Sequence, residues 1–156
     1  MPLLAKQISD LILSGARLAQ EAGKLPSYQL PAYIHLTRPK RREWGDYSSA
    51  LPLQLSKHMS CSPIDIADQI QNHLPQSAML GDSTVSVPGF LNITLSGEWL
   101  CSQAERVIKE GPSFADLEHH LNNKAQVEFV SANPTGPLTV GHGRGGAIGD
   151  TLSNLL

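Results

Sequence analysis

The stretch from residue 131 to residue 137 constrains the fold most, because two prolines stand there directly ahead of a glycine-rich segment. Proline donates no backbone hydrogen bond and biases the residue before it towards extended conformations, so this stretch predicts an irregular loop. The apolar run over residues 127–130 predicts a strand, and a helix is expected from Gly141 or His142 to Leu156. A strand, a loop and a helix are half of a βαβ unit and do not make a domain alone.

Residues 1–110 carry a different pattern, which begins with apolar residues spaced three or four apart. This spacing predicts an amphipathic helix that ends at Gly23. Its expected inner stripe contains Leu4, Ile8, Leu11, Gly15, Leu18 and Ala22. Residues 33–36 form a β-prone run that predicts a short strand, and part of 46–59 is expected to be helical, with Pro52 in its first turn or at a kink.

The remainder of this region predicts two capped helices and a hairpin. Ser62 followed by Pro63 is typical of a helix start, and that helix is expected to stop at Pro75. Apolar and polar residues alternate around the turn at residues 88–89, which predicts two strands with one buried face. Ser96 is expected to cap a further helix, ended by Gly111. Residues 1–110 therefore predict an α+β domain on a small antiparallel sheet.

Composition limits the classes of function. With 40% hydrophobic and 17% charged residues among 156, the chain suits a soluble domain plus a piece of another. The net charge of -2 is not that of a chain that binds nucleic acid, or DNA in particular, over its whole surface. The start lacks the pattern of a secretory signal and no stretch is long enough to span a membrane, which favours the cytoplasm.

Few residues qualify as metal ligands. Cys61 and Cys101 stand far apart with no histidine at ligand spacing, and reduced thiols are expected. His119 and His120 lie in a polar connection, where a solvated linker is the simpler interpretation. We therefore expect no metal site.

Glycines at the predicted start of the last helix offer two interpretations. Gly141, Gly143 and Gly146 match the pattern GxGxxG, whose exposed amides suit a phosphate, but a glycine-rich turn that packs a helix on a sheet explains them as well. Spacing alone leaves both open. An NAD site fits less well, because ten residues separate Val130 from Gly141 and no acidic residue follows at the required distance.

Longer motifs give a resemblance to a known family. The segment VEFVSANPTGPLTVGHGR over residues 127–144, continued by GGAIGD, resembles the opening of the catalytic domain of arginyl-tRNA synthetases, including the class I "HIGH" element at residues 139–142. The segments at residues 38–40, 45–47 and 88–92 resemble the additional N-terminal domain of that family. One departure is Thr139, which stands where the element has its first histidine.

The resemblance implies a function and a set of site residues. It implies an arginine–tRNA ligase, which activates L-arginine with ATP as a substrate in the presence of Mg²⁺, without a permanently bound cofactor, and transfers it to tRNA(Arg). Glu128, Ser131, Asn133 and His142 would contact arginine. Thr139, Gly141 and His142 would bind ATP, with His142 as the catalytic residue that stabilises phosphate charge.

The same resemblance implies a division of the chain. Residues 1–110 would form the tRNA-contacting domain, residues 111–124 a linker, and residues 125–156 the start of a Rossmann-like catalytic domain. The 156 residues alone are not expected to complete an active site. A second hypothesis is a standalone or degenerate tRNA-binding module without catalysis.

The basic run after residue 37 has a local interpretation and one from the family. Charge runs are usually solvated surface, which is the simpler interpretation here. With the resemblance, we expect the run to contact tRNA phosphates, through Arg38, Lys40, Arg41 and Arg42. Trp44 and Tyr47 are expected to anchor the loop rather than to stack on bases.

Overall fold

The computed structural model describes residues 4–115, 125–133 and 135–155 of the chain. It divides into two compact units, residues 1–116 and residues 117–156. We describe each unit by itself. In the described part of the chain no helix is long and apolar enough to cross a membrane.

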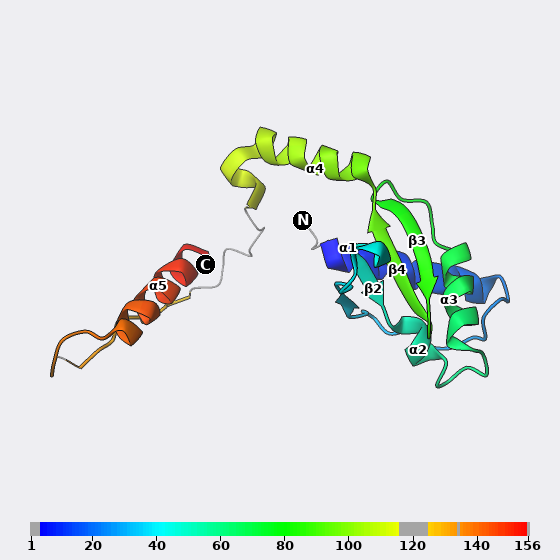
Figure 1. The fold of residues 1–156 in the computed structure, drawn as a ribbon, viewed down its shortest axis with the longest axis horizontal. Helices are drawn as coiled ribbons and strands as arrows, with labels where there is room; N and C mark the ends of the chain where they lie inside the picture. Colours follow the sequence, from blue (N-terminus) through cyan, green and yellow to red (C-terminus); the bar gives the residue numbers. More distant parts are fainter. Residues whose placement is uncertain (1–3, 116–124, 134, 156) are drawn as a thin grey trace. The chain divides into compact units, whose positions relative to one another are not determined.

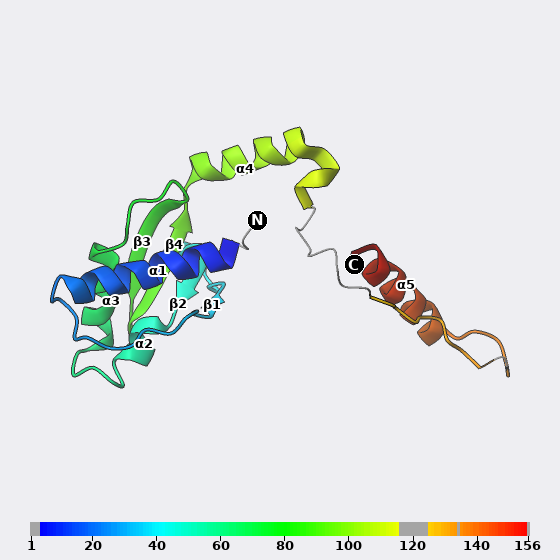
Figure 2. The same cartoon turned by 180° about the vertical axis from the view of Figure 1, so that it is seen from behind.

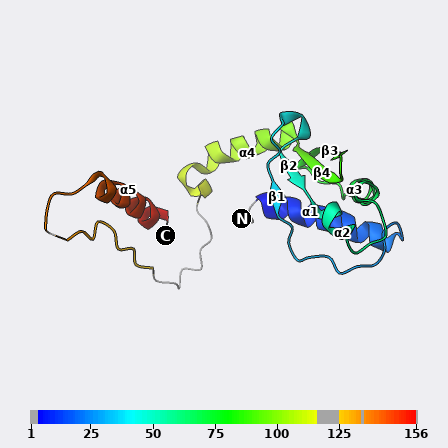
Figure 3. The ribbon, with the colours of Figure 1, turned by 60° about the horizontal axis from the view of Figure 1, so that its bottom comes forward.

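The first unit is an antiparallel sheet with helices on one of its faces. Its four strands lie in the order β1-β2-β4-β3, and every neighbouring pair is antiparallel. Helix α1 lies behind the sheet in Figure 1 and in front of it in Figure 2, and α1 and α2 lie on the same side of the strands in Figure 3. The strands are β1 (Leu36–Thr37), β2 (Tyr47–Ser49), β3 (Leu80–Ser86) and β4 (Phe90–Leu95).

The helices of this unit begin where the sequence places capping residues. Ser62 accepts a hydrogen bond from the backbone N–H of Asp65 at 3.1 Å, and Ser96 accepts one from Trp99 at 3.3 Å, so both predicted caps are confirmed. The hairpin predicted around residues 88–89 is confirmed as β3 and β4. The helices are α1 (Leu4–Glu21), α2 (Leu51–Leu55), α3 (Pro63–Asn72) and α4 (Gly97–Glu110).

The core lies between the sheet and helices α1 to α3. Ile12, Ile66 and Leu91 are completely removed from solvent, from α1, α3 and β4 respectively. Gly15 lets α1 approach α3 closely, because a Cβ there would lie 3.0 Å from Leu74 Cδ2. Leu18 and Ala22 were expected in the inner stripe of α1, but Leu18 is 42% exposed and Ala22 is exposed beyond the end of the helix. The buried stripe passes through Ala16 and Ala19 instead.

The strand β2 was not expected from the sequence, and one predicted strand is absent. Residues 47–49 were assigned to a region with a helix, whereas they form the strand between β1 and β4. The strand predicted over residues 127–130 was wrong, since residues 125–133 have no regular secondary structure. A strand requires a hydrogen-bonded partner, and the described residues of the second unit offer only the helix α5 (Val140–Leu155).

In the second unit the segment before the loop packs directly on α5. A Cβ at Gly149 would overlap the ring of Phe129, and a Cβ at Gly146 would lie 2.9 Å from Val130 Cγ2. Val130 has φ of 57°, an unusual conformation for a β-branched residue, which ends the extended run before the proline-containing loop. The segment thus contacts α5 at two glycines, Gly146 and Gly149. Of the connection predicted over residues 111–124, residues 111–115 form a 3-10 turn, and residues 116–124 lie outside the described ranges.

This packing gives a test of the second unit. We expect Gly149→Ala to displace Phe129 and to cost about 1–3 kcal/mol, because the added methyl group has no free volume. Gly143→Ala on the same helix is the matched control, since a Cβ there meets nothing within 4 Å and alanine favours a helix by about 1 kcal/mol. The measurement is amide hydrogen exchange along α5. Equal effects of the two substitutions would show that Phe129 does not rest on the helix.

Candidate nucleic-acid interface and helix start

A row of polar side chains crosses the face of the sheet opposite the helices. Leu91, Ile93 and Leu95 are buried in the core, and side chains alternate along a strand, so Asn92 faces the other way. The register aligns Asn92 with Ser48, and Ser48 with Thr37. The outer face therefore presents one residue from each of three adjacent strands in a line.

This row forms the floor of a cavity of about 310 Å³ with a basic rim. Arg38, Lys40 and Trp44 line it beside the polar row. The full lining is Thr37, Arg38, Pro39, Lys40, Trp44, Ser48, Ser86, Val87, Phe90 and Asn92. A guanidinium, an ammonium, an indole and an amide around one cavity are the groups that bind a phosphate and an unpaired base.

Hydrogen bonds fix the polar floor of this cavity. The Asn92 amide nitrogen donates to the Ser86 hydroxyl at 3.0 Å, and no described residue donates to the amide oxygen. Thr37 Oγ1 donates to the Ser48 carbonyl oxygen at 3.4 Å. Asn92 lines the cavity and is only 3% exposed, so the protein sets the orientation of its side chain.

Two aromatic rings hold the arginines of the basic run. The Arg38 guanidinium lies 5.5 Å from the ring centroid of Tyr47, and that of Arg41 lies 5.1 Å from the ring centroid of Trp44. Arg41 also pairs with Glu43 at 3.4 Å, an exposed contact of little energy. Tyr47 is half-buried against the core and anchors the loop as expected, whereas Trp44 is 39% exposed and lines the cavity.

The loop that carries the basic run is fixed at the end of the sheet. The Asp46 carboxylate accepts a hydrogen bond from the Leu95 backbone N–H at 2.8 Å, and the Asp46 N–H donates to the Ile93 carbonyl at 2.8 Å. Gly45 has φ of 80°, and a Cβ there would lie 2.7 Å from the Ile93 carbonyl oxygen, so the close approach requires glycine. The sequence GDY at residues 45–47 thus places the basic run beside the cavity.

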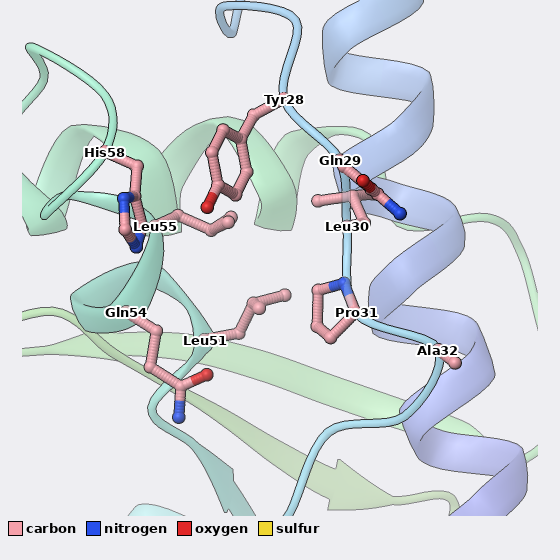
Figure 4. A pocket seen from close by; sticks show the side chains of 9 residues that line it. All are labelled: Tyr28, Gln29, Leu30, Pro31, Ala32, Leu51, Gln54, Leu55 and His58. Carbon is pink, nitrogen blue, oxygen red and sulfur yellow. The ribbon is translucent and has the colours of Figure 1, made fainter.

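A second cavity in this unit has a different character. It measures about 370 Å³ and lies between the extended residues 28–32 and α2 (Figure 4). Leu51 and Leu55 point into it from α2, and Tyr28 stacks on His58 at 4.9 Å between ring centroids. No arginine or lysine lines it. Of these two cavities, the one on the outer face of the sheet is therefore the candidate for RNA.

At the start of α5 the structure brings together two of the predicted ATP-site residues. The Thr139 backbone N–H donates to His142 Nδ1 at 3.0 Å, and Thr139 Oγ1 accepts from the His142 backbone N–H at 3.4 Å. The Gly143 N–H donates to the Thr139 carbonyl at 3.2 Å and opens the helix. Gly141 lies between the two residues, with its Cβ position 3.5 Å from Thr139 Oγ1.

The predicted arginine-site residues are not brought to this pair. Glu128, Ser131 and Asn133 are exposed, and within the described ranges no hydrogen bond or ion pair joins them to His142. Phe129 and Val130 contact α5, whereas Glu128 is exposed. Lys40 and Arg42 are exposed like the rest of the basic run.

The comparisons with known proteins agree with these features. Residues 5–95 match the family model described as the arginyl tRNA synthetase N terminal domain, which is more than half of the chain. The chain belongs to the arginyl-tRNA synthetase family. The match contains the basic run, Asp46 and Asn92, so the resemblance noted in the sequence is confirmed.

Curated relatives extend this likeness into the second unit. The arginine–tRNA ligase of Dehalococcoides mccartyi is 38% identical over 138 residues, which cover 88% of this chain and 24% of the relative. That of Dechloromonas aromatica is 44% identical over 123 residues, covering 79% of this chain and 21% of the relative. The chain thus spans about a quarter of the length of such relatives, and matches of this length cannot end at residue 95.

A solved structure is similar in fold to this chain. The Thermus thermophilus arginyl-tRNA synthetase aligns with a TM-score of 0.57 and 26% identity, covering 96% of this chain and 22% of that one. The α+β domain on a small antiparallel sheet, predicted from the sequence, is therefore confirmed, and the sheet has four strands.

Proposed function

We propose that this chain supplies the N-terminal part of an arginine–tRNA ligase, which activates L-arginine with ATP and transfers it to tRNA(Arg). The observation that carries the proposal is the family match over residues 5–95. Two relatives that bear the name arginine–tRNA ligase, at 38% and 44% identity, also support the proposal, because their matches extend into the second unit. Soluble action in the cytoplasm is part of the same proposal.

We propose that the two units have different roles, with tRNA contact in the first and part of the catalytic site in the second. Residues 1–110 would contact tRNA through the cavity on the outer face of the sheet, with Arg38 and Lys40 on phosphates and Asn92 on an unpaired base. Residues 111–124 would be a linker. Exposure and positive charge on one rim support this assignment, because phosphate contacts dominate affinity for RNA. Arg41 and Arg42 would add charge at the edge.

Residues 125–156 would begin a Rossmann-like catalytic domain. Thr139, Gly141 and His142 would bind ATP at the start of α5, where free amides and the helix dipole attract anions. Glu128, Ser131 and Asn133 would bind arginine, and a carboxylate is the natural partner of a guanidinium. Mg²⁺ would arrive with the phosphates of ATP, since this ion is usually bound through one or two carboxylates and substrate phosphates.

The tRNA assignment is tested by titrating the 156-residue chain with tRNA(Arg) and with an unrelated tRNA at several salt concentrations. We expect Arg38→Ala with Lys40→Ala to weaken tRNA binding on the order of tenfold. The slope of the logarithm of affinity against the logarithm of salt concentration should fall by roughly one or more, as for the loss of at least one phosphate contact. The reason is that both charges lie on the rim of the cavity.

The matched control is Arg17→Ala with Lys57→Ala, which removes the same charge from exposed positions outside this cavity. It is expected to leave the salt slope unchanged. If both double variants weakened binding equally, only net charge would matter, and the cavity would not be the tRNA site.

A further inference from the structure

The contacts between Thr139 and His142 determine which nitrogen of the His142 ring carries the proton. A backbone N–H can only donate, and the Thr139 N–H points at His142 Nδ1 at 3.0 Å. If Nδ1 carried a proton, two donors would face each other at hydrogen-bonding distance. Nδ1 must therefore be an acceptor, which leaves the proton of the neutral ring on Nε2.

The threonine hydroxyl adds two more contacts to the same ring and residue. Thr139 Oγ1 lies 3.3 Å from His142 Nδ1, where the hydroxyl proton donates to the same lone pair. The lone pairs of Oγ1 accept the His142 backbone N–H at 3.4 Å. The arrangement resembles a capping box, in which the residue at the cap and the residue three positions later bond reciprocally, here with a histidine in place of the usual glutamate.

We propose that Thr139 is a positioning residue that holds the His142 imidazole in one orientation and one tautomer, with Nε2–H presented at the start of α5. His142 is exposed, so Nε2–H is a donor open to a ligand. The ring acts as a neutral donor rather than as a cation. Its role towards ATP rests on the proposed function, whereas the tautomer and its cause do not.

The contacts of Thr139 explain why threonine can replace the first histidine of the element at this position. A histidine side chain cannot make both contacts of the threonine hydroxyl, because a given ring nitrogen either donates or accepts and does not do both. Threonine is among the favoured residues at a helix cap, and its hydroxyl both accepts and donates. In this chain residue 139 therefore supports the second histidine of the element through its own hydroxyl and backbone N–H.

The experiment is nuclear magnetic resonance on the 15N-labelled 156-residue chain in alkaline buffer, where free imidazole is neutral. The deciding signal is a 15N–15N coupling through the hydrogen bond between the Thr139 amide and His142 Nδ1. We expect this coupling in the wild-type chain and in Thr139→Ser, which keeps the hydroxyl. We expect it to be lost in Thr139→Val, whose His142 amide should also exchange about fivefold faster, as for loss of a helix cap.

Thr151→Val is the matched control on the same helix. The Thr151 hydroxyl donates to the Ala147 carbonyl at 2.8 Å and has no part in the cap, so this variant should keep the coupling. Absence of the coupling from the wild-type chain, or its persistence unchanged in Thr139→Val, would overturn the proposal. The readout uses neither ATP nor arginine, so such a result would leave the proposed ligase function standing.

Discussion

Replacing Ile66 by alanine is expected to lower the free energy of unfolding of the first unit by about 2–5 kcal/mol. Ile66 is 0% exposed on α3, where it fills the space between the helices and the sheet. The substitution removes buried apolar area and leaves a cavity that the surrounding side chains cannot close. Because a domain of this size has only about 5–15 kcal/mol in total, the loss is a large share.

The matched control is Ile64→Ala on the same helix. Ile64 is 38% exposed, so its truncation removes less buried area and is expected to cost about 1 kcal/mol or less. Trp44 and Trp99, the two tryptophans of the chain, both lie in the first unit, so fluorescence during urea denaturation reports on that unit alone. If both substitutions lowered the free energy of unfolding equally, the face of α3 that carries Ile66 would not be buried in the core.

Both substitutions also bear on the interface. The core holds β4 against β2, and this pairing aligns Asn92 with Ser48. Under conditions where Ile66→Ala is still folded, the outer face should keep its register and its tRNA affinity. Ile66→Ala should then lower the free energy of unfolding without weakening tRNA binding. The reason is that the buried face of the strands determines stability and the outer face forms the proposed tRNA interface.

Sequence patterns predicted the helices of the first unit well, since local signals decide helix ends. Ser62 and Ser96 are caps in the sequence and in the structure. Leu18 shows the limit of the method, because a spacing of three or four fits several stripes on a helix. The choice among these stripes depends on what packs against them, which is here the close contact at Gly15.

The strands show where local signals fail. Residues 47–49 are tyrosine and two serines, which lack an alternating apolar pattern, yet Ser49 is 0% exposed in β2. Its hydroxyl accepts the Leu51 N–H at 3.2 Å, which makes its burial tolerable. Residues 127–130 are the opposite case, with a strong β-prone pattern but no partner strand in the described ranges.

The basic run of the candidate site was visible in the sequence, but its partners were not. Alternation along residues 91–95 already implied that Asn92 faces away from the core. What the sequence could not supply was the register that places Ser48 and Thr37 beside it, or the turn at Asp46 that brings Arg38 to the same cavity. Cross-strand neighbours depend on pairing between distant segments, which local patterns do not encode.

His142→Ala is expected to lower the rate of arginylation by about a hundredfold to a thousandfold, the usual effect of removing one preorganised donor from a charged transition state. The test uses a chimera in which residues 1–156 replace the corresponding part of the Dechloromonas aromatica ligase, which is 44% identical over 123 residues. The measured quantities are kcat and the KM for tRNA(Arg). The loss should fall on kcat, with the KM unchanged, because the ring contacts no tRNA in the proposal.

Two further variants of the chimera make this result specific. His35→Ala removes an exposed histidine of the first unit and should leave both constants unchanged. Arg38→Ala with Lys40→Ala should raise the KM for tRNA(Arg) and leave kcat unchanged, the reverse of the His142 result. Such a reversal would show that His142 acts on the chemical step and that Arg38 and Lys40 act on tRNA binding. If His142→Ala left kcat at the level of the unsubstituted chimera, the start of α5 would be a structural turn, as its glycines alone allowed.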